Sequence, residues 1–298
     1  MVGYLDQLAY EGSACTERNY RTQLAPFERF CDQRKITTLE GISPDTVRAY
    51  LKAEQHAVVR LGGRDTDRTI GRSTLIARYS VLRVFLEWCV TEGHLPANPM
   101  ATVPRPKREK RIRHAFTAEE VRRLLTASKE ADGKLAARDH AIVTALLGTG
   151  ARASELLGLT WANVKWDEGY FVVFGKGAKE RRLRMGKPLR TALRKWRDAA
   201  PKIPGDWVWV TTRRTPMSLA TLEGMCRRLG EYADVPNCHP HRFRHTFAAE
   251  FTRLNRDVVA TKARLGHARI STTEEYLHSL GVDHGLDESY KTPDEWLR

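Results

Sequence analysis

The stretch Tyr170-Phe-Val-Val-Phe-Gly-Lys-Gly-Ala-Lys-Glu-Arg-Arg-Leu-Arg-Met185 predicts a β-hairpin in a chain whose other segments have mainly helical periodicity. An apolar run rich in aromatic and β-branched residues leads into a glycine-containing turn, and a partly alternating run follows it. Amphipathic stripes follow the hairpin around Leu189–Trp196, around Leu219–Leu229, and along Phe243, Phe247 and Phe251. We therefore predict that this half of the chain is mostly α-helical with a small β-sheet.

The N-terminal half carries the pattern of a helical bundle and looks all-helical. Apolar residues three and four positions apart lie on one face of the segment Thr16–Arg34. Ser43 followed by Pro44 is typical of a helix start, since the hydroxyl caps free amides and proline fits the first turn. A third stripe runs along Leu75–Cys89. We assign these stripes to a buried core.

The length of 298 residues suffices for two domains, each with a core of its own. Residues 1–103 carry a net charge of +1, whereas the rest of the chain carries +13. Two prolines in residues 104–114 disfavour a regular helix between the halves. We predict a helical domain over 1–103, a basic linker over 104–114 and a second domain over 115–298, which opens with a capping box at 117–120 and ends with a tail over 277–298.

The net charge of +14 and the isoelectric point near 9.8 indicate a polyanionic partner, most simply nucleic acid. The linker concentrates this charge, with six basic residues against one acid. We interpret it as a strap along a DNA backbone, and the alternative is a solvated tether. The candidate DNA-binding residues in the linker are Arg105, Lys107, Arg108, Lys110, Arg111 and Arg113.

Several classes of protein do not fit the sequence. No apolar run is long enough to cross a bilayer, and the N-terminus lacks the pattern of a signal peptide, so we expect a cytoplasmic protein. Five cysteines without a CxxC pair indicate reduced thiols. The cluster Cys238, His239, His241 and His245 lacks a second pair of ligands, so we expect neither a metal site nor a cofactor.

Four separated segments carry a more specific signal. They are Thr149-Gly-Ala-Arg-Ala-Ser-Glu-Leu156, Gly175-Lys-Gly-Ala-Lys-Glu-Arg181, His241-Arg-Phe-Arg-His245 and Leu265-Gly-His-Ala-Arg-Ile-Ser-Thr-Thr-Glu-Glu-Tyr276. In order and spacing they resemble the signature of the tyrosine recombinases of the phage-integrase family. The resemblance implies an N-terminal core-binding domain and a C-terminal catalytic domain that clamp duplex DNA. It covers most of residues 115–280, while residues 1–103 match only as a helical domain of suitable size.

The chemistry of cutting and rejoining DNA gives the matched residues their roles. A protein nucleophile must form a covalent link that a new strand later displaces, and Tyr276 is the candidate. Two guanidinium groups can hold a phosphate under attack by forked hydrogen bonds, and Arg152 and Arg244 are the candidates. Glu155, one turn after Arg152, has a supporting role in orienting basic groups. Arg182, Arg190 and Arg194 are interpreted as solvated surface charges.

The resemblance supplies the remaining roles. His241 is implied as a proton-transfer or phosphate-binding group on the same helical face as Arg244, and His267 as a hydrogen-bond donor to a phosphate oxygen. Lys176 holds the position of the general acid for the leaving 5′-oxygen, with Lys179 as the alternative.

The family reaction runs through a 3′-phosphotyrosine inside a homotetramer on specific core sites of double-stranded DNA. Gly281 and Gly285 interrupt the tail that docks neighbouring subunits in the family. An integrase of a phage or mobile element is expected, with an Xer-like dimer resolvase as the alternative. A DNA-binding protein without turnover and a topoisomerase are the rivals. Target sequence, directionality and accessory factors do not follow from the sequence.

Overall fold

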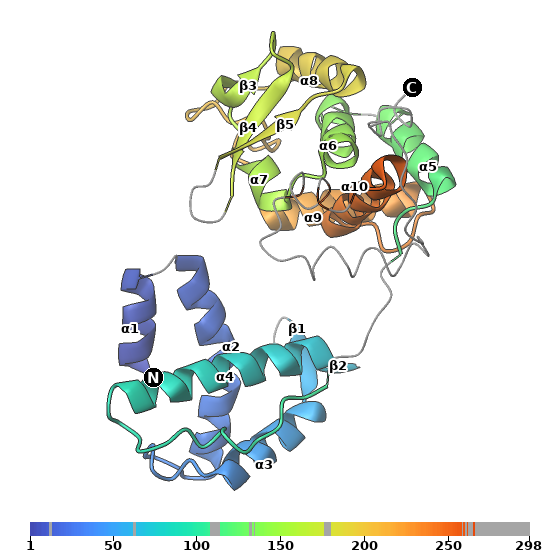
Figure 1. Ribbon diagram of the computed structural model, residues 1–298. Helices are drawn as coiled ribbons and strands as arrows, with labels where there is room; N and C mark the ends of the chain where they lie inside the picture. The colour runs from blue at the N-terminus through green and yellow to red at the C-terminus, as the bar shows by residue number, and fades with distance from the viewer. Residues whose placement is uncertain are drawn as a thin grey trace. The chain divides into compact units, whose positions relative to one another are not determined.

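The computed structural model divides into two compact units, Met1–Arg111 and Ile112–Arg298, and each is described by itself (Figure 1). The structure describes residues 1–11, 14–61, 64–107, 114–130, 133, 135–175, 180–257, 259, 261 and 265. Among these residues, no helix combines the length and apolar character that crossing a bilayer requires. Helices form most of both units and the larger sheet lies in unit 2, which confirms the predicted fold class.

Unit 1 is built on helices α1 (Val2–Glu11), α2 (Ala14–Gln33), α3 (Pro44–Gln55) and α4 (Arg72–Thr91). Helix α2 packs against α1 and α4, and α3 packs against α4. Ser43 caps α3 as predicted, since its hydroxyl accepts a 3.2 Å hydrogen bond from the backbone amide of Thr46. Aromatic residues fill much of the core, where the rings of Phe27 and Tyr50 meet edge to face.

An antiparallel ribbon interrupts the helices of unit 1. Strand β1 (Val58–Leu61) pairs with β2 (Arg64–Thr69). The expectation that this half is entirely helical is therefore wrong at these residues. The strands lack a clear apolar alternation, which is the signal that the prediction depended on. The consecutive glycines Gly62 and Gly63, between runs with β-branched residues, are a hairpin signal that the periodicity does not include.

Unit 2 surrounds one buried helix. Its helices are α5 (Ala118–Glu130), α6 (Ala136–Thr149), α7 (Ala153–Leu157), the 3-10 helix η1 (Trp161–Asn163), α8 (Lys187–Ala199), α9 (Leu219–Tyr232) and α10 (Pro240–Asn255). Helix α6 is buried along residues 141–147 and packs against α5, α8 and α10 (Figure 1). The predicted capping box opens α5, because the Thr117 amide donates to the Glu120 carboxylate at 2.8 Å and the Glu120 amide donates to the Thr117 hydroxyl at 3.1 Å.

The predicted hairpin forms two strands of a three-stranded antiparallel sheet. The strands are β3 (Val164–Lys165), β4 (Tyr170–Phe174) and β5 (Glu180–Arg184), in the order β3-β4-β5. Phe171 and Leu183 pair across β4 and β5 and are buried against the helices. Phe174 lies on the opposite face and is 53% exposed. Helix α7 packs against β4, so the hairpin and the segment around Arg152 are neighbours (Figure 1).

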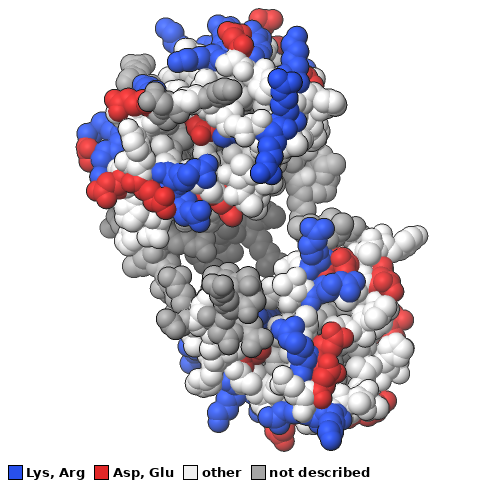
Figure 2. Space-filling view, turned by 180° about the vertical axis from the view of Figure 1, so that it is seen from behind, with Lys and Arg blue, Asp and Glu red and all other residues white. Residues whose placement is uncertain are grey.

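Charged side chains differ between the surfaces of the two units. In the view of Figure 2, Lys and Arg are interspersed with Asp and Glu on both units, and a row of Lys and Arg also runs along one edge of unit 2. This agrees with the sequence, in which residues 1–103 are nearly neutral and the later part carries +13. Most of the net positive charge therefore belongs to unit 2 and the linker.

Candidate active site

The turn that joins α6 to α7 is set by Gly150. This residue ends α6 with a φ of 62°, in the left-handed region, and its amide donates to the carbonyl of Leu146. A Cβ added to Gly150 would lie 2.3 Å from the ring of Phe247 on α10. The glycine is therefore required both by the backbone conformation and by the close packing of α10.

Arg152 follows two residues later, as the N-cap of α7. The Glu155 carboxylate accepts the Arg152 backbone amide at 2.8 Å and the Arg152 guanidinium at 2.6 Å. The Glu155 side chain is 1% exposed, whereas that of Arg152 is 38% exposed. The buried carboxylate therefore binds the backbone and one Nη of an arginine that still reaches the surface. The supporting role of Glu155 stays a prediction.

Arg181 is a third member of this group that the prediction missed. It lies on β5, and its Nη2 donates to Oε2 of Glu155 at 3.2 Å. Its side chain is 15% exposed, whereas that of the adjacent Arg182 is 69% exposed. The strand alternation was the available signal, because Arg181 shares the inward phase with the apolar Leu183. A charged residue in a buried phase requires a partner of opposite charge.

Arg244 lies on α10 and is buried, with 4% of the residue exposed. Its Nη1 donates to the carbonyl of Gly150 at 2.6 Å, and its Nη2 donates to the carbonyl of Leu265 at 2.7 Å. The first bond ties α10 to the turn that carries Arg152. The second reaches a residue two positions before His267. Arg244 thus links segments that are far apart in the sequence.

His241 lies in the first turn of α10 and is exposed. The helix starts there because the His239 side chain accepts the amide of Arg242 at 3.2 Å and Pro240 occupies the first turn. Since His241 and Arg244 are three residues apart on this helix, both belong to the same side of α10. An exposed imidazole at this position is accessible to a ligand, whereas Arg244 is buried and bound to the carbonyls of Gly150 and Leu265.

The structure therefore brings Arg152, Glu155 and Arg244 together around the Gly150 turn, and it adds Arg181. The other predicted catalytic residues, Lys176, His267 and Tyr276, lie outside the described residues, as do the alternative Lys179 and the linker residues Arg108, Lys110, Arg111 and Arg113. Arg105 and Lys107 are described and exposed. The linker leaves unit 1 beside α4, because Arg72 Nε donates to the carbonyl of Lys107 at 2.8 Å.

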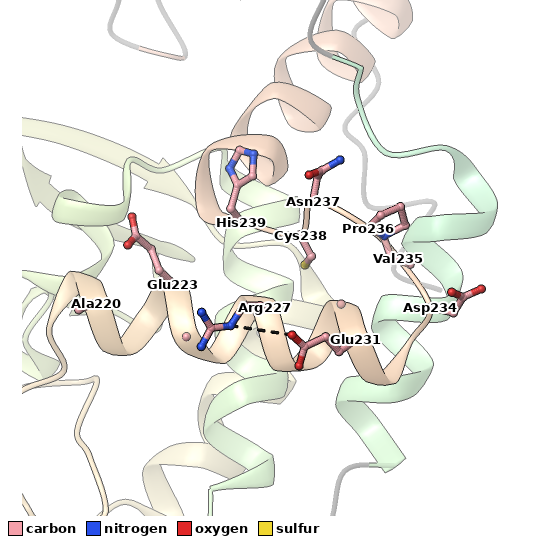
Figure 3. Close-up of a pocket in the computed structure, with 12 residues that line it drawn as sticks. Ala220, Glu223, Arg227, Glu231, Asp234, Val235, Pro236, Asn237, Cys238 and His239 are labelled. Atoms are coloured by element: carbon pink, nitrogen blue, oxygen red, sulfur yellow. Dashed lines mark ion pairs between the residues drawn. The ribbon is translucent and has the colours of Figure 1, made fainter. Parts of the chain in front are cut away.

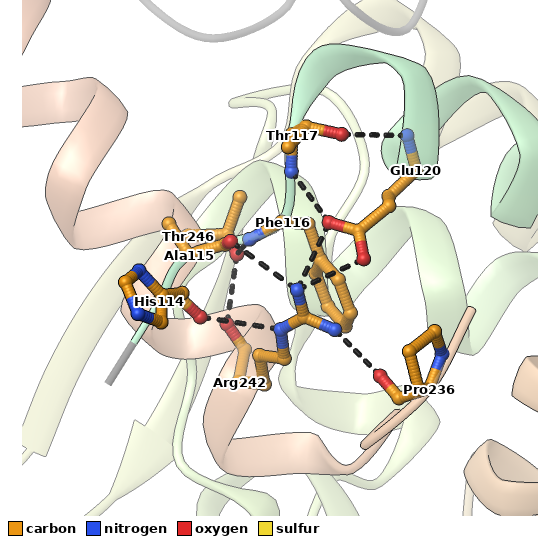
Figure 4. Close-up of polar contacts among 8 residues, drawn as sticks. All are labelled: His114, Ala115, Phe116, Thr117, Glu120, Pro236, Arg242 and Thr246. Carbon is orange, nitrogen blue, oxygen red and sulfur yellow. Dashed lines mark hydrogen bonds and ion pairs between the residues drawn. The ribbon is translucent and has the colours of Figure 1, made fainter. Parts of the chain in front are cut away.

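Arg242, the other arginine of the His241–His245 segment, is bound to the protein instead. Its guanidinium contacts the Glu120 carboxylate at 2.9 Å and donates to the carbonyls of His114 and Pro236 at 3.2 and 2.6 Å (Figure 4). It also stacks 4.1 Å from the centre of the Phe116 ring. These contacts hold the segment of unit 2 that precedes α5 against the start of α10.

A hollow of unit 2 is lined by none of Arg152, Arg181 and Arg244. It has a volume of about 710 Å³ and is lined by α9 and by the loop that leads to His239 (Figure 3). Its lining includes Glu223, Glu231 and Asp234, and its Arg227 is paired with Glu231. With three carboxylates on its lining, the hollow offers a phosphodiester less positive potential than the arginines around Gly150.

The cysteines offer no second nucleophile among the described residues. Cys226 and Cys238 are buried free thiols. Burial raises the pKa of the Cys238 thiol to about 12 and raises the pKa of Cys226 as well. Both are therefore protonated at neutral pH, and a thiol is a much weaker nucleophile than a thiolate. Within the described ranges, no three His, Cys, Asp or Glu side chains form a group that could hold a metal ion.

Comparison with known proteins gives a consistent family. The model of the phage integrase family matches residues 114–281, and that of the phage integrase N-terminal SAM-like domain matches residues 1–93. Tyrosine recombinase XerC of Yersinia pestis is 32% identical over 260 residues, which cover 86% of this chain and 85% of XerC. XerC of Salmonella typhi is 30% identical over 261 residues, 86% of each chain.

Solved structures share the fold at lower identity. The site-specific recombinase XerH bound to palindromic difH substrate matches with a TM-score of 0.74 at 18% identity, over 91% of this chain and 78% of XerH. A lambda integrase dimer bound to a COC′ core site matches with a TM-score of 0.70 at 20% identity, over 96% of both chains. With one family model spanning more than half of the sequence and relatives of this similarity, the chain belongs to the phage integrase family of tyrosine recombinases.

Proposed function

We propose that the chain is a site-specific recombinase that cuts and rejoins DNA through a covalent bond to Tyr276. The Tyr276 oxygen attacks the scissile phosphorus, the bond to the 5′-oxygen breaks, and a 3′-phosphotyrosine and a 5′-hydroxyl result. The 5′-hydroxyl of another strand then attacks the phosphotyrosine, and Tyr276 leaves with its proton restored. The phosphodiester is regained without an external energy source.

The observation that carries the proposal is the Gly150 turn, to which both arginines of the phosphate clamp are attached. Arg152 follows this turn directly, and Arg244 donates to the Gly150 carbonyl at 2.6 Å. Negative charge gathers on the non-bridging oxygens of a phosphate under attack, and two fixed guanidinium groups stabilise it. The same positive potential favours the phenolate form of Tyr276.

The remaining groups move protons or bind phosphate. Lys176 protonates the leaving 5′-oxygen, with Lys179 as the alternative donor. His241, exposed at the start of α10, binds phosphate or transfers a proton, and His267 donates a hydrogen bond to a phosphate oxygen. The protein side chains supply all of these steps.

The partner is double-stranded DNA with specific core sites, on which the chain acts as a homotetramer. Strand exchange needs two duplexes and one nucleophile for each of four strands, and a tetramer supplies four. The basic linker contributes contacts to the DNA backbone through Arg105, Lys107, Arg108, Lys110, Arg111 and Arg113. The reaction takes place in the cytoplasm, at the nucleoid, or in the host cytoplasm if a phage encodes the chain.

Two biological uses of this chemistry are candidates. Integration of a phage or mobile element is supported by fold neighbours such as the Tn1549 transposon integrase, which matches with a TM-score of 0.71 at 16% identity. Xer-like resolution is favoured by the sequence relatives, since XerC proteins are 30–32% identical to this chain. Plasmids carrying two sites in direct repeat, or one site each on two plasmids, separate deletion from integration as the preferred outcome.

A covalent-trapping experiment tests the proposal. Repeated binding selection from a randomised duplex library yields a bound sequence, and a series of duplexes of that sequence carries a nick at successive positions. Cleavage beside a nick releases a short fragment and traps the enzyme on DNA, so a species that resists SDS is expected. Tyr276→Phe should bind the same duplex and form no adduct, because it lacks only the attacking oxygen.

The same experiment separates the rival functions. Sequence-selective binding without an adduct at any nick position would support a DNA-binding protein without turnover. Relaxation of an unrelated supercoiled plasmid at a rate similar to that on the selected sequence would support a topoisomerase. An adduct that persists in Tyr276→Phe would reject this tyrosine as the nucleophile.

A further inference from the structure

Arg181 lies where the sheet meets the phosphate-binding turn. It is opposite Val173 in the β4–β5 ladder and faces the packed side of the sheet. Its guanidinium is largely covered, with 15% of the side chain exposed, whereas Arg182 is 69% exposed. A covered arginine on a short strand is expensive to desolvate unless a carboxylate compensates its charge. Glu155 supplies that carboxylate.

Glu155 is shared between two arginines. Oε1 accepts the Arg152 guanidinium at 2.6 Å, and Oε2 accepts the Arg152 amide at 2.8 Å and Arg181 at 3.2 Å. The carboxylate is 1% exposed, so water does not screen these contacts. The two contacts on Oε2 fix the plane of the carboxylate, and that plane fixes the direction from which Arg152 is bound.

The sharing also sets the charge that a substrate meets. Two guanidinium groups and one carboxylate leave a net positive charge, and Arg152 is the more exposed cation, at 38%. Without Arg181, the full negative charge of Glu155 would act on Arg152. Arg152 would then be drawn toward the carboxylate and would give less potential to a phosphate.

We propose that Arg181 is a positioning residue for DNA cleavage, which acts through Glu155 on the phosphate-binding Arg152. The inference rests on the proposed function of Arg152 and extends it to a largely covered residue that acts through the Glu155 carboxylate. Arg181 shares the negative charge of Glu155 and fixes its orientation, and Arg152 stays extended toward the scissile phosphate.

The test compares single-turnover cleavage by the full-length wild-type chain, Arg181→Met and Arg181→Lys on the nicked duplex described above. Arg182→Met is the matched control, because it removes a neighbouring arginine of the same strand that is exposed. Arg181→Met should slow cleavage by about 30-fold while duplex binding changes by less than about 3-fold. Arg181→Lys, which keeps the charge without the planar fork, should recover most of the rate, and Arg182→Met should stay within about 2-fold of wild type.

A neutral substrate distinguishes positioning from loss of structure. In a duplex with a methylphosphonate at the scissile position, the reacting group carries no negative charge, so the setting of Arg152 matters less. The defect of Arg181→Met should then shrink from about 30-fold to below about 5-fold. An undiminished defect on this substrate would mean that Arg181 supports the hairpin rather than Arg152, and would overturn the inference.

Other outcomes are equally decisive. Equal rates for Arg181→Met and Arg182→Met would reject a role for Arg181. If Arg181→Met does not fold, Arg181→Lys carries the same comparison between charged and neutral substrates, with an expected defect of about 5-fold on phosphate alone. A wild-type chain that forms no adduct on any duplex would refute the proposed function. A wild-type chain that cleaves, together with an Arg181→Met variant that cleaves equally well, would refute only the inference about Arg181.

Discussion

The two faces of α10 use the same residue type in opposite ways. Arg242 and Arg244 are two positions apart in one segment, which is about 200° around a helix. Arg242 faces the segment that precedes α5. It binds Glu120 and the carbonyls of His114 and Pro236. Arg244 faces the turn at Gly150 and donates to the main-chain carbonyls of Gly150 and Leu265.

The two arginines differ in the acceptors that the described contacts give them. Arg242 has a carboxylate at 2.9 Å, so its charge is satisfied within the protein. The contacts of Arg244 with Gly150 and Leu265 are to carbonyl dipoles, which orient a guanidinium without cancelling its charge. The side of α10 that carries Arg242, here called the outer face, therefore stabilises the fold. The side that carries Arg244, the inner face, is suited to hold a phosphate. Substitutions on each face should separate stability from cleavage.

The largest expected effect is on cleavage by Arg244→Lys. A lysine keeps the charge but cannot span both carbonyls and a phosphate with a planar fork. We expect the adduct-forming rate to fall by about 10³-fold, roughly 4 kcal/mol, while duplex binding changes by less than about 3-fold. Arg253→Lys, on the same helix and 59% exposed, is the control and should retain the wild-type rate. A normal rate for Arg244→Lys would remove the distinction between the two faces.

Arg242→Met should affect stability instead. It breaks an ion pair that is largely covered, with 12 and 14% of the two side chains exposed, and leaves several carbonyls without their donor. We expect the free energy of unfolding to fall by about 3 kcal/mol, as measured by denaturant titration. Arg253→Met should cost less than about 1 kcal/mol, because its pair with Glu250 is more exposed.

Cleavage by Arg242→Met distinguishes the faces further. At a temperature where the variant is fully folded, its adduct-forming rate should stay within about 3-fold of wild type, since Arg242 is not part of the phosphate clamp. Loss of cleavage at unchanged stability would show that the outer face also contributes to the site. The two substitutions together would then no longer separate folding from chemistry.

Local sequence signals predicted much of the fold. The caps at Ser43 and Thr117 and the hairpin around Gly175 all depend on residues a few positions apart, and each is found where it was expected. The β1–β2 ribbon was not predicted, because its strands are largely polar and lack the apolar alternation of a half-buried strand. Periodicity depends on apolar residues at regular spacing, and the sequence of this ribbon has few of them.

The site was harder to derive, because its contacts join distant parts of the chain. Motif resemblance selected Arg152 and Arg244 as catalytic candidates, a role that stays a prediction. The sequence could not distinguish the roles of Arg181 and Arg242, since their carboxylate partners lie 26 and 122 residues away. Which charge a neighbour neutralises depends on tertiary packing, and no local pattern encodes it.

Gly150→Ala sharpens the comparison at the point where the inner face meets α6. The new Cβ would be 2.3 Å from the Phe247 ring, at a backbone φ of 62°. We expect a loss of about 2 kcal/mol in unfolding free energy and an adduct-forming rate about 10-fold lower, because the carbonyl that Arg244 binds is displaced. Gly169→Ala is the control, since its φ is 72° and its nearest contact is 3.8 Å away, and it should cost about 1 kcal/mol with normal cleavage.

The smallest expected effect concerns two exposed cations at the start of the linker. Arg105 and Lys107 are exposed at the end of unit 1, and if the linker lies along DNA, they exchange counterions for phosphates. Replacing both with glutamine should weaken binding to any duplex by about 3-fold near 0.1 M salt and make the slope of log K against log salt shallower by about 1 to 2. Arg21→Gln, an exposed arginine already paired with Glu17, should leave the slope unchanged. An unchanged slope in the double variant would make the linker a tether, and the DNA-directed charge would then be confined to unit 2.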